Sequence, residues 1–277
     1  MVETIKKVSI IGIGNLGKQI AKWAAFYGYN VTIFDIKKEG LRDFVDNTYK
    51  EIQQKGASGE IYIKDSLNAA VKDADLIIEA VPEKLDIKRD IFSQIDKAAP
   101  THAIIATNSS SIPVSMLEES VERKDKVLNV HFYKLPTFPM ADIARGTKTS
   151  DQTFEIGKRW IESIEITPLV LKKQCLGFVF NRVWRAIKKE CLKIWAGGYA
   201  DIEMVDKAWD IFSRNPIAPF KFMDIIGLDV VYDIEMMYYN ESGDPTDKPP
   251  KKFEEKVKRG ELGVKSGKGF YDYSANE

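Results

Sequence analysis

The sequence has little that would support a disulfide-rich, zinc-binding or membrane-spanning protein. It contains two cysteines and two histidines in 277 residues, and the cysteines, Cys175 and Cys191, form no CxxC pair. A disulfide framework or a zinc site is therefore not expected, and a reducing cytoplasm is the simplest setting. The sequence also lacks an apolar run of membrane-spanning length. The first strand pattern begins so early that we expect no signal peptide.

An excess of charge of either sign is also missing. The 41 Lys and Arg residues balance the 41 Asp and Glu residues, so the formal net charge is +0. This balance argues against a general role in binding nucleic acid or an anionic membrane surface. We therefore expect the partner to be a small molecule.

What the sequence does have is a glycine-rich turn between an apolar strand and a helical pattern, Gly12-Ile13-Gly14-Asn15-Leu16-Gly17. In this context GxGxxG indicates a dinucleotide site and not merely a strand–turn–helix connection. Gly12 permits the tight turn, Gly14 lets the backbone approach a pyrophosphate, and Gly17 lets helix and strand pack closely. We predict that the turn, including Asn15 and Leu16, binds the cofactor.

The type of dinucleotide is indicated by Asp35, which follows the second apolar strand. A carboxylate in this position accepts hydrogen bonds from both ribose hydroxyls and repels a 2′-phosphate, which favours NAD over NADP. Lys37 and Lys38 lie close by and could tolerate the phosphate. We predict NAD as the cofactor.

The organisation of the chain changes near Lys173. Before it, strand and helix patterns alternate, which predicts a Rossmann-type, doubly wound, mostly parallel α/β sheet for residues 1–173. After it the pattern is helical and bulky, which predicts an all-α domain for residues 174–277. We expect this domain to carry the substrate site. Because it is apolar on several faces, we also expect it to form a homodimer.

Polar residues mark the ligand side of the predicted sheet. Ligands bind where parallel strands end, and Glu83, Asn108, Ser110 and His131 each follow an apolar strand. We expect Ser111 to cap a helix that begins directly after it. Capping by Ser111 would leave Ser110 free to face a ligand.

The two histidines differ in position. His102 lies in a helix-to-strand connection at the opposite edge of the sheet, which favours a solvated loop residue. His131 is either a satisfied buried histidine or a general base. A base needs an orienting carboxylate, and Asp142 is the nearest acid downstream, unless it is only a solvated acid at a strand start. Asn181 could be no more than a polar position on a helix. The residues alone thus indicate an NAD-linked oxidoreductase.

Motifs in the same order along nearly the whole chain resemble the L-3-hydroxyacyl-CoA dehydrogenase family. They are Gly12–Gly17, Ala74–Glu83, Thr107–Ser111, His131-Phe132, Gly177–Arg182, Pro219-Phe220, Asp224–Asp229 and Leu262–Tyr271. The resemblance implies reversible hydride transfer between NAD and C3 of a 3-hydroxyacyl-CoA, such as 3-hydroxybutyryl-CoA, in fatty acid metabolism. It implies no metal.

The resemblance also assigns roles to single residues. His131 would be the catalytic base and Asp142 its orienting acid, while Ser110 and Asn181 would hold the substrate's oxygens. The implied cofactor contacts outside the glycine turn are Asp35, Glu83, Lys88, Asn108, Ser110 and Lys265.

Three departures from the family pattern stand out. The acid, Asp142, is an Asp where the family has Glu, and it lies one residue nearer to the histidine. Lys134 stands where the family has Asn. The segment after Asp35 is short and lacks most of the helical hairpin that helps to bind CoA, which leaves Arg42 and Lys50 as candidate phosphate partners.

Other short stretches resemble a branch that acts on substrates without CoA, the diketoreductases and gulonate dehydrogenases. They are Ala24–Tyr29, Asp86–Ile91 and Gly146–Thr149. Two alternatives to an acyl-CoA dehydrogenase therefore stay open. One is an enzyme of the same fold that acts on a free 3-oxo, diketo or sugar acid, and the other is a non-catalytic NAD-sensing or structural protein.

Overall fold

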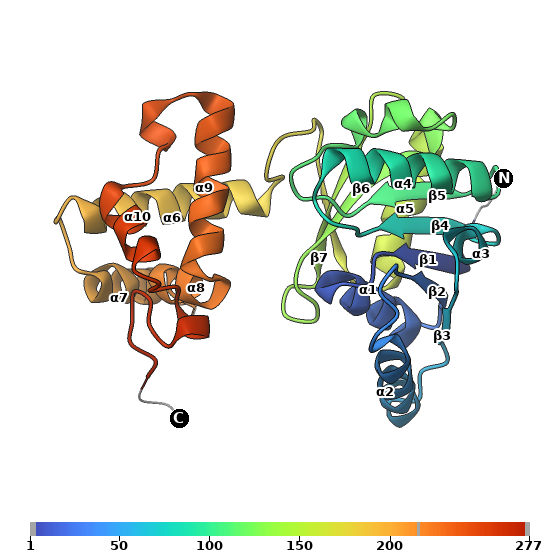
Figure 1. Cartoon of the computed structure of the whole chain (residues 1–277), viewed down its shortest axis with the longest axis horizontal. Helices are drawn as coiled ribbons and strands as arrows, with labels where there is room; N and C mark the ends of the chain where they lie inside the picture. Colours follow the sequence, from blue (N-terminus) through green and yellow to red (C-terminus); the bar gives the residue numbers. More distant parts are fainter. Residues whose placement is uncertain (1–3, 215–216, 275–277) are drawn as a thin grey trace. The chain divides into compact units, whose positions relative to one another are not determined.

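In the computed structural model, which describes residues 4–214 and 217–274, the short apolar stretches of the N-terminal part form one sheet (Figure 1). Its strands are β1 (Lys7–Ile11), β2 (Asn30–Phe34), β3 (Glu60–Ile63), β4 (Leu76–Glu79), β5 (Ile104–Thr107), β6 (Val127–Phe132), β7 (Met140–Arg145) and β8 (Thr167–Val170). The strand order is β3-β2-β1-β4-β5-β6-β7-β8. Neighbours run parallel except β6 and β7, which are antiparallel. The predicted doubly wound, mostly parallel sheet is confirmed.

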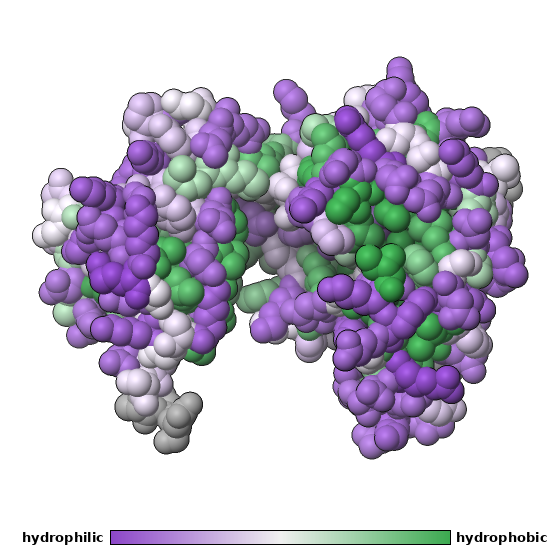
Figure 2. Space-filling model, viewed as in Figure 1, coloured by the Kyte–Doolittle hydropathy of each residue, from purple (hydrophilic) through white to green (hydrophobic). Residues whose placement is uncertain are grey.

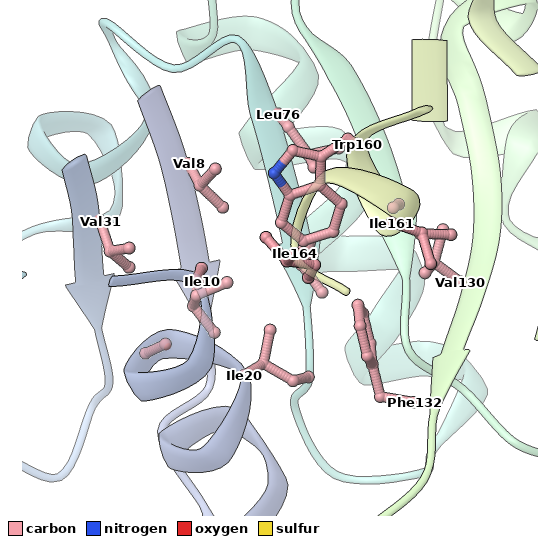
Figure 3. Packing of buried hydrophobic residues seen from close by; sticks show 14 of the residues in the cluster. Val8, Ile10, Ile20, Val31, Leu76, Val130, Phe132, Trp160, Ile161 and Ile164 are labelled. Atoms are coloured by element: carbon pink, nitrogen blue, oxygen red, sulfur yellow. The ribbon is translucent and has the colours of Figure 1, made fainter. Parts of the chain in front are cut away.

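Helices cover both faces of this sheet, because successive strand residues point to opposite sides. Ile10 of β1 belongs to a cluster with α1 (Asn15–Phe26), α2 (Leu41–Gln54) and α5 (Asp151–Ser163). Figure 3 shows Trp160 and Ile161 of α5 over Val130 and Phe132 of β6. Ile11 faces the opposite cluster. That cluster is built with α3 (Leu67–Val71), α4 (Leu85–Ala98) and the 3-10 turn η1 (Val114–Met116). Two further 3-10 turns are η2 (Glu118–Ser120) and η3 (Lys124–Lys126).

The order of the strands reverses between β1 and β4. From β1 the chain runs outward to β2 and β3 and then returns to β4 on the other side of β1. In such sheets the crevice for a ligand opens at the carboxyl ends of the strands beside this switch point. The ends of β1 and β4 lead directly into Gly12 and into the Glu83 loop.

The C-terminal part is helical, as predicted. Its elements are α6 (Phe180–Ala196), α7 (Ile202–Ser213), α8 (Pro219–Ile226), α9 (Leu228–Ser242), η4 (Pro245–Asp247), α10 (Lys251–Lys258) and η5 (Val264–Ser266). At its centre the Phe270 ring contacts the rings of Phe220 and Phe253, and Trp195 contacts Phe220 and Phe270. Gly227, with φ 102°, separates α8 from α9, so the long apolar stretch forms two helices.

The last described residues are fastened to α8 by one buried carboxylate. Asp224, which is completely buried, accepts hydrogen bonds from Phe270 N (2.8 Å), Tyr271 N (2.9 Å) and the Tyr273 hydroxyl (3.0 Å). A Cβ at Gly263 would lie 2.2 Å from the Asp224 carbonyl oxygen. The Leu262–Tyr271 motif thus has a packing role in this part of the chain.

Contacts divide the chain into two compact units, Met1–Val179 and Phe180–Glu277. The domain boundary that composition places near Lys173 stays a prediction. None of the helices in the described part of the chain combines the length and the apolar composition needed to cross a lipid bilayer.

Candidate active site

The glycine turn after β1 has the geometry of a dinucleotide site. Gly12 adopts φ 98°, and a Cβ there would lie 2.6 Å from the Ala80 carbonyl oxygen. A Cβ at Gly17 would lie 2.0 Å from the Gly12 carbonyl oxygen, so both positions require glycine. Gly14 is exposed, and a Cβ there would meet nothing within 4 Å. Because Gly14 has no capping side chain, the first N–H groups of α1 are available to an anion.

Asp35 is tied to this turn by its carboxylate. Ile13 N donates to Oδ2 (2.6 Å) and Lys37 N donates to Oδ1 (2.8 Å), while the residue stays partly exposed. The Lys38 ammonium is drawn away, because it donates to the Lys64 carbonyl (2.7 Å) and lies over the Phe34 ring. This fixed carboxylate at the end of β2 fits the recognition of two ribose hydroxyls.

A buried ion pair lies behind the end of β4. The Lys88 ammonium, 1% exposed, lies 2.7 Å from Glu79 Oε1 and 3.3 Å from Glu83 Oε2. Val81 N (2.7 Å) and the Thr107 hydroxyl (2.8 Å) also donate to Glu79, so this buried carboxylate is well supplied with partners. Lys88 and Glu83 stay predicted cofactor contacts, and Glu79 is a buried partner that the sequence reading missed.

The loop after β5 corrects the expectation that Ser111 caps a helix. No α-helix begins at this point; the segment turns into η1. Ser111 instead donates from its backbone N (2.9 Å) and its hydroxyl (2.7 Å) to Glu83 Oε1, and the Ser109 hydroxyl donates to the same oxygen. Ile112 N donates to Ser109 Oγ (2.8 Å). The Ser111 hydroxyl thus binds the Glu83 carboxylate and does not cap a helix.

These contacts change the ionisation of Glu83. Burial opposes the charged form, but the hydrogen bonds from Ser109 and Ser111 and the charge of Lys88 outweigh it and lower the pKa of Glu83 to about 2. Glu83 is therefore a fixed anion at neutral pH. It joins the end of β4 to the loop that follows β5.

His131 and Asp142 meet across the antiparallel pair β6 and β7. Their Cα atoms are register partners, so the two side chains project from the same face of the sheet at directly opposed positions. His131 Nδ1 lies 3.3 Å from Asp142 Oδ2, and the side chains are 9% and 0% exposed. This is a long hydrogen bond, and catalytic hydrogen bonds are often long in structures without a ligand.

Three neighbours complete this pair, and sequence reasoning missed all of them. The Tyr133 hydroxyl donates to Asp142 Oδ2 (2.5 Å), and Val179 N donates to Asp142 Oδ1 (3.2 Å). The Phe178 ring stacks on His131, with centroids 5.3 Å apart. Phe178 adopts φ 51°, which is unusual for a phenylalanine and typical of strained functional segments. The signal for Tyr133 was its place two residues after His131, which puts both on one face of an extended chain.

Asn108 and Ser110 lie at the same edge of the sheet. Asn108 Oδ1 accepts from Phe132 N (2.9 Å), which ties the end of β5 to the end of β6 beside His131. Ser110 is exposed in the loop that follows. Asn129, also on β6, donates through Nδ2 to the carbonyls of Thr107 and Ser109 (3.1 Å each) and holds this loop in place.

Two predicted site residues belong to the second unit, Phe180–Glu277. Asn181 is partly buried in the first turn of α6. The Lys265 ammonium forms an ion pair with Asp229 (2.6 Å) and is about half exposed. Both stay predictions as site residues. His102, by contrast, lies at the opposite edge of the sheet from His131, where it is 3.2 Å from Asp75.

The chemistry available at this edge is acid–base and electrostatic. Across residues 4–214 and 217–274, no three side chains of the His, Cys, Asp or Glu type come together in a way that could hold a metal ion. The strand ends supply a glycine turn with the geometry of a dinucleotide site, an anchored carboxylate that would suit a ribose, and a buried histidine–aspartate pair. This set suits the transfer of a proton beside a nicotinamide ring.

Comparisons with known proteins agree with this geometry. The family model of the 3-hydroxyacyl-CoA dehydrogenase NAD binding domain matches residues 7–175, and the model of the C-terminal domain matches residues 177–273. The 3-hydroxybutyryl-CoA dehydrogenase of Clostridioides difficile is 32% identical over 281 residues, which cover 97% of this chain and 99% of that protein.

Two solved structures are also similar over the whole chain. An (S)-3-hydroxybutyryl-CoA dehydrogenase from Ralstonia eutropha has a TM-score of 0.88 at 30% identity and covers 98% of this chain and 99% of its own. A diketoreductase that acts on dicarbonyl compounds has a TM-score of 0.84 at 34% identity and covers 98% and 100%. From the matched domains and the NAD-binding turn we conclude that the chain belongs to the 3-hydroxyacyl-CoA dehydrogenase family and is an NAD-dependent oxidoreductase.

Proposed function

We propose that the protein catalyses the reversible, NAD-dependent oxidation of a 3-hydroxyacyl-CoA at C3, with 3-hydroxybutyryl-CoA as the model substrate. The observation that carries the proposal is the buried His131–Asp142 pair at the edge where the strands β1, β4 and β5 also end. A role in fatty acid metabolism and a cytoplasmic location belong to the same proposal.

The residues around the glycine turn fit the cofactor. The open space at Gly14 and the first turn of α1 would take the pyrophosphate, and Asp35 would take the adenosine ribose. Glu83, Lys88 and Asn108 would lie toward the nicotinamide, and Lys265 would also contact the cofactor. When bound, NAD supplies the hydride acceptor.

The work of the protein is then to move a proton. With its Nδ1–H directed to Asp142, the imidazole of His131 keeps Nε2 as an acceptor for the proton of the substrate hydroxyl. Loss of that proton would let the C3–OH become a carbonyl, and bound NAD would supply the acceptor for the hydride that leaves C3. Asp142 stabilises the imidazolium that forms, and a positioned base of this kind contributes about 10²–10⁴-fold to the rate.

Substrate orientation would come from two polar side chains. Ser110, exposed in the loop that follows β5, and Asn181 of α6 would hold the hydroxyl and carbonyl oxygens. Their contribution is to keep C3 aligned for transfer, which reduces the entropic cost of the reaction. Arg42 and Lys50, both exposed on α2, would contact the phosphates of CoA.

A second candidate function has a specific observation in its favour. The similar diketoreductase acts on dicarbonyl compounds, and its identity to this chain is as high as that of the 3-hydroxybutyryl-CoA dehydrogenases. A substrate without CoA would need the same His131 chemistry and no phosphate partners on α2.

Rates of NADH oxidation with acetoacetyl-CoA, acetoacetate and a diketo ester, compared at equal concentration, test the proposal. We expect acetoacetyl-CoA to give the highest kcat/KM by at least about tenfold. A reversed order would favour the diketo substrate. Intact NADH binding with no turnover on any compound would favour a non-catalytic NAD-binding protein.

His131→Ala tests the role of the base. We expect kcat to fall by about 10²–10⁴-fold while the Kd for NADH, measured by fluorescence, changes little. His102→Ala is the matched control, since it removes the second histidine, at the far edge of the sheet, and should leave both values unchanged. Full turnover in His131→Ala would refute the assignment.

A further inference from the structure

A tyrosine hydroxyl shares the carboxylate oxygen that holds the candidate base. Tyr133 follows β6 directly and lies two residues after His131, so both side chains lie on the face that Asp142 occupies from β7. All three residues are buried, at 8%, 7% and 1% exposed. The face of β6 opposite to them packs into the apolar cluster shown in Figure 3.

The hydrogen bonds to Asp142 are unequal. Oδ2 receives the Tyr133 hydroxyl at 2.5 Å and faces His131 Nδ1 at 3.3 Å, while Oδ1 receives Val179 N at 3.2 Å. The shortest of the three contacts is the one to the tyrosine. Because Asp142 is shielded from water, these donors, and not solvent, determine how much negative charge faces the imidazole.

We propose that Tyr133 is a positioning residue that acts on His131 through Asp142. Its hydroxyl fixes the rotation of the carboxylate and takes up part of the charge on Oδ2. A carboxylate that shares its charge with this hydroxyl stabilises the imidazolium less than a free carboxylate would. This inference rests on the proposed function, in which His131 is the general base.

The other groups around the His131 imidazole support the view that the Tyr133 hydroxyl is the main influence on it through Asp142. The Phe178 ring stacks on His131 and the Tyr133 ring meets it edge-on at 4.7 Å, and neither ring carries a charge. Asp142 is the residue of β7 that faces the His131 imidazole. Farther along β7, Arg145 is engaged with Asp151. In the part of the chain that the structure describes, Asp142 and Tyr133 are thus the titratable side chains in direct contact with His131.

Tyr133→Phe in the full-length protein tests the proposal, because it removes the hydroxyl and keeps the ring. NMR titration of the imidazole signals gives the pKa of His131 directly. The sequence has two histidines, and a His102→Gln background leaves one signal to follow. We expect the pKa of His131 to rise by about 0.5 to 1 pH unit, as for the loss of one shared hydrogen bond. The acidic limb of kcat/KM against pH should move by the same amount, with the Kd for NADH unchanged within about twofold.

The control is Tyr27→Phe, which removes another tyrosine–carboxylate bond of the first unit, to Glu165 at 2.8 Å. It should leave the pKa of His131 and the pH profile unchanged. In an Asp142→Asn background the effect of Tyr133→Phe should vanish, since the carboxylate that couples the two residues is gone. An effect that persists there would overturn the proposed route through Asp142.

A further variant covers the case in which Tyr133→Phe folds poorly. Replacing Tyr133 with 3-fluorotyrosine keeps the shape and makes the hydroxyl a stronger donor, so the pKa of His131 should fall instead of rise. An unchanged pKa in the variant that folds overturns the proposal. If the pKa moves but His131→Ala keeps full turnover, the proposed function fails although the coupling exists, and the positioning role is withdrawn.

Discussion

Glu83 illustrates how one carboxylate can organise several loops at the edge of the sheet. One of its oxygens collects donors from Ser109 and Ser111, and the other faces the Lys88 ammonium. Two strand ends that are separate in the sequence are thereby fixed to one another. The folded state holds this carboxylate more firmly as an anion than the unfolded chain does.

Acid should therefore weaken the protein partly through Glu83. Its pKa is about 2 in the folded state against an ordinary 4.5, so its ionised form adds stability that is complete above about pH 4.5 and lost as the pH falls toward 2. Urea unfolding at a series of pH values should show Glu83→Gln less stable than the wild type at pH 6, with a difference that shrinks below pH 4.5. A difference that does not depend on pH would contradict this account.

Single residues differed in how far the sequence could place them. His131 and Asp142 could be paired in advance because Asp142 is the nearest acid downstream of the histidine and matches the position of the family's orienting acid. Their opposed register across β6 and β7 is a finding of the structure. The 3.3 Å contact itself, and the tyrosine that shares it, depend on side-chain rotation that no spacing encodes. Ser111 was misread because a capping serine and a serine that donates to a distant carboxylate look alike in sequence.

At the scale of elements, the strand–turn–helix of β1 and α1 uses its glycines for two separable purposes. Gly12 and Gly17 are fixed by protein atoms within 3 Å of a Cβ. Gly14 is not, because a Cβ there would meet nothing within 4 Å. Gly12 and Gly17 therefore serve folding, and we propose that Gly14 serves the ligand.

Substitution by alanine should separate these purposes. Gly17→Ala should lower the Tm by several degrees, because overpacking costs about 1–3 kcal/mol. Gly14→Ala should keep the Tm and raise the Kd for NADH by about tenfold or more, because its methyl group occupies the space for the pyrophosphate. Calorimetry measures the Tm of both variants, and NADH titration measures their Kd for NADH. Wild-type NADH affinity in Gly14→Ala would place the cofactor elsewhere.

Helices and strands were predicted best where the apolar periodicity is strong. They were predicted worst where contacts to a buried polar group determine the local structure. The alternation of apolar strands and helices indicated the doubly wound sheet, and the glycine turn located its ligand edge. The Leu262–Tyr271 motif could be recognised but not explained, because Gly263 and Gly269 pack against Asp224, which lies far away in the sequence.

For the whole molecule, one helix of the second unit leaves an apolar stripe uncovered. Met204, Ala208, Ile211 and Phe212 of α7 are exposed at helical spacing, with Ile211 at 72% and Phe212 at 87%. On the face drawn in Figure 2, hydrophilic side chains cover most of each unit, with apolar side chains between them. An exposed stripe of large apolar side chains is typical of an interaction surface. We propose that it contributes to a homodimer.

Light scattering after gel filtration tests this proposal. We expect the wild type to elute with twice the chain mass of 31.4 kDa and Ile211→Asp to shift toward the monomer. Ile36→Asp is the matched control, since Ile36 is 85% exposed in the first unit and should leave the mass unchanged. A monomeric wild type at micromolar concentration would refute the dimer.

The short segment Phe178-Val179 has a consequence for protein engineering. These residues end the first unit, and they carry the ring that covers His131 and the N–H that binds Asp142. A chimera that joins this nucleotide-binding unit to a foreign helical domain should therefore cross over after Val179. A junction at Lys173 would replace Phe178 and Val179 together with the helices. The foreign domain would then supply the ring and the backbone N–H that contact the histidine–aspartate pair.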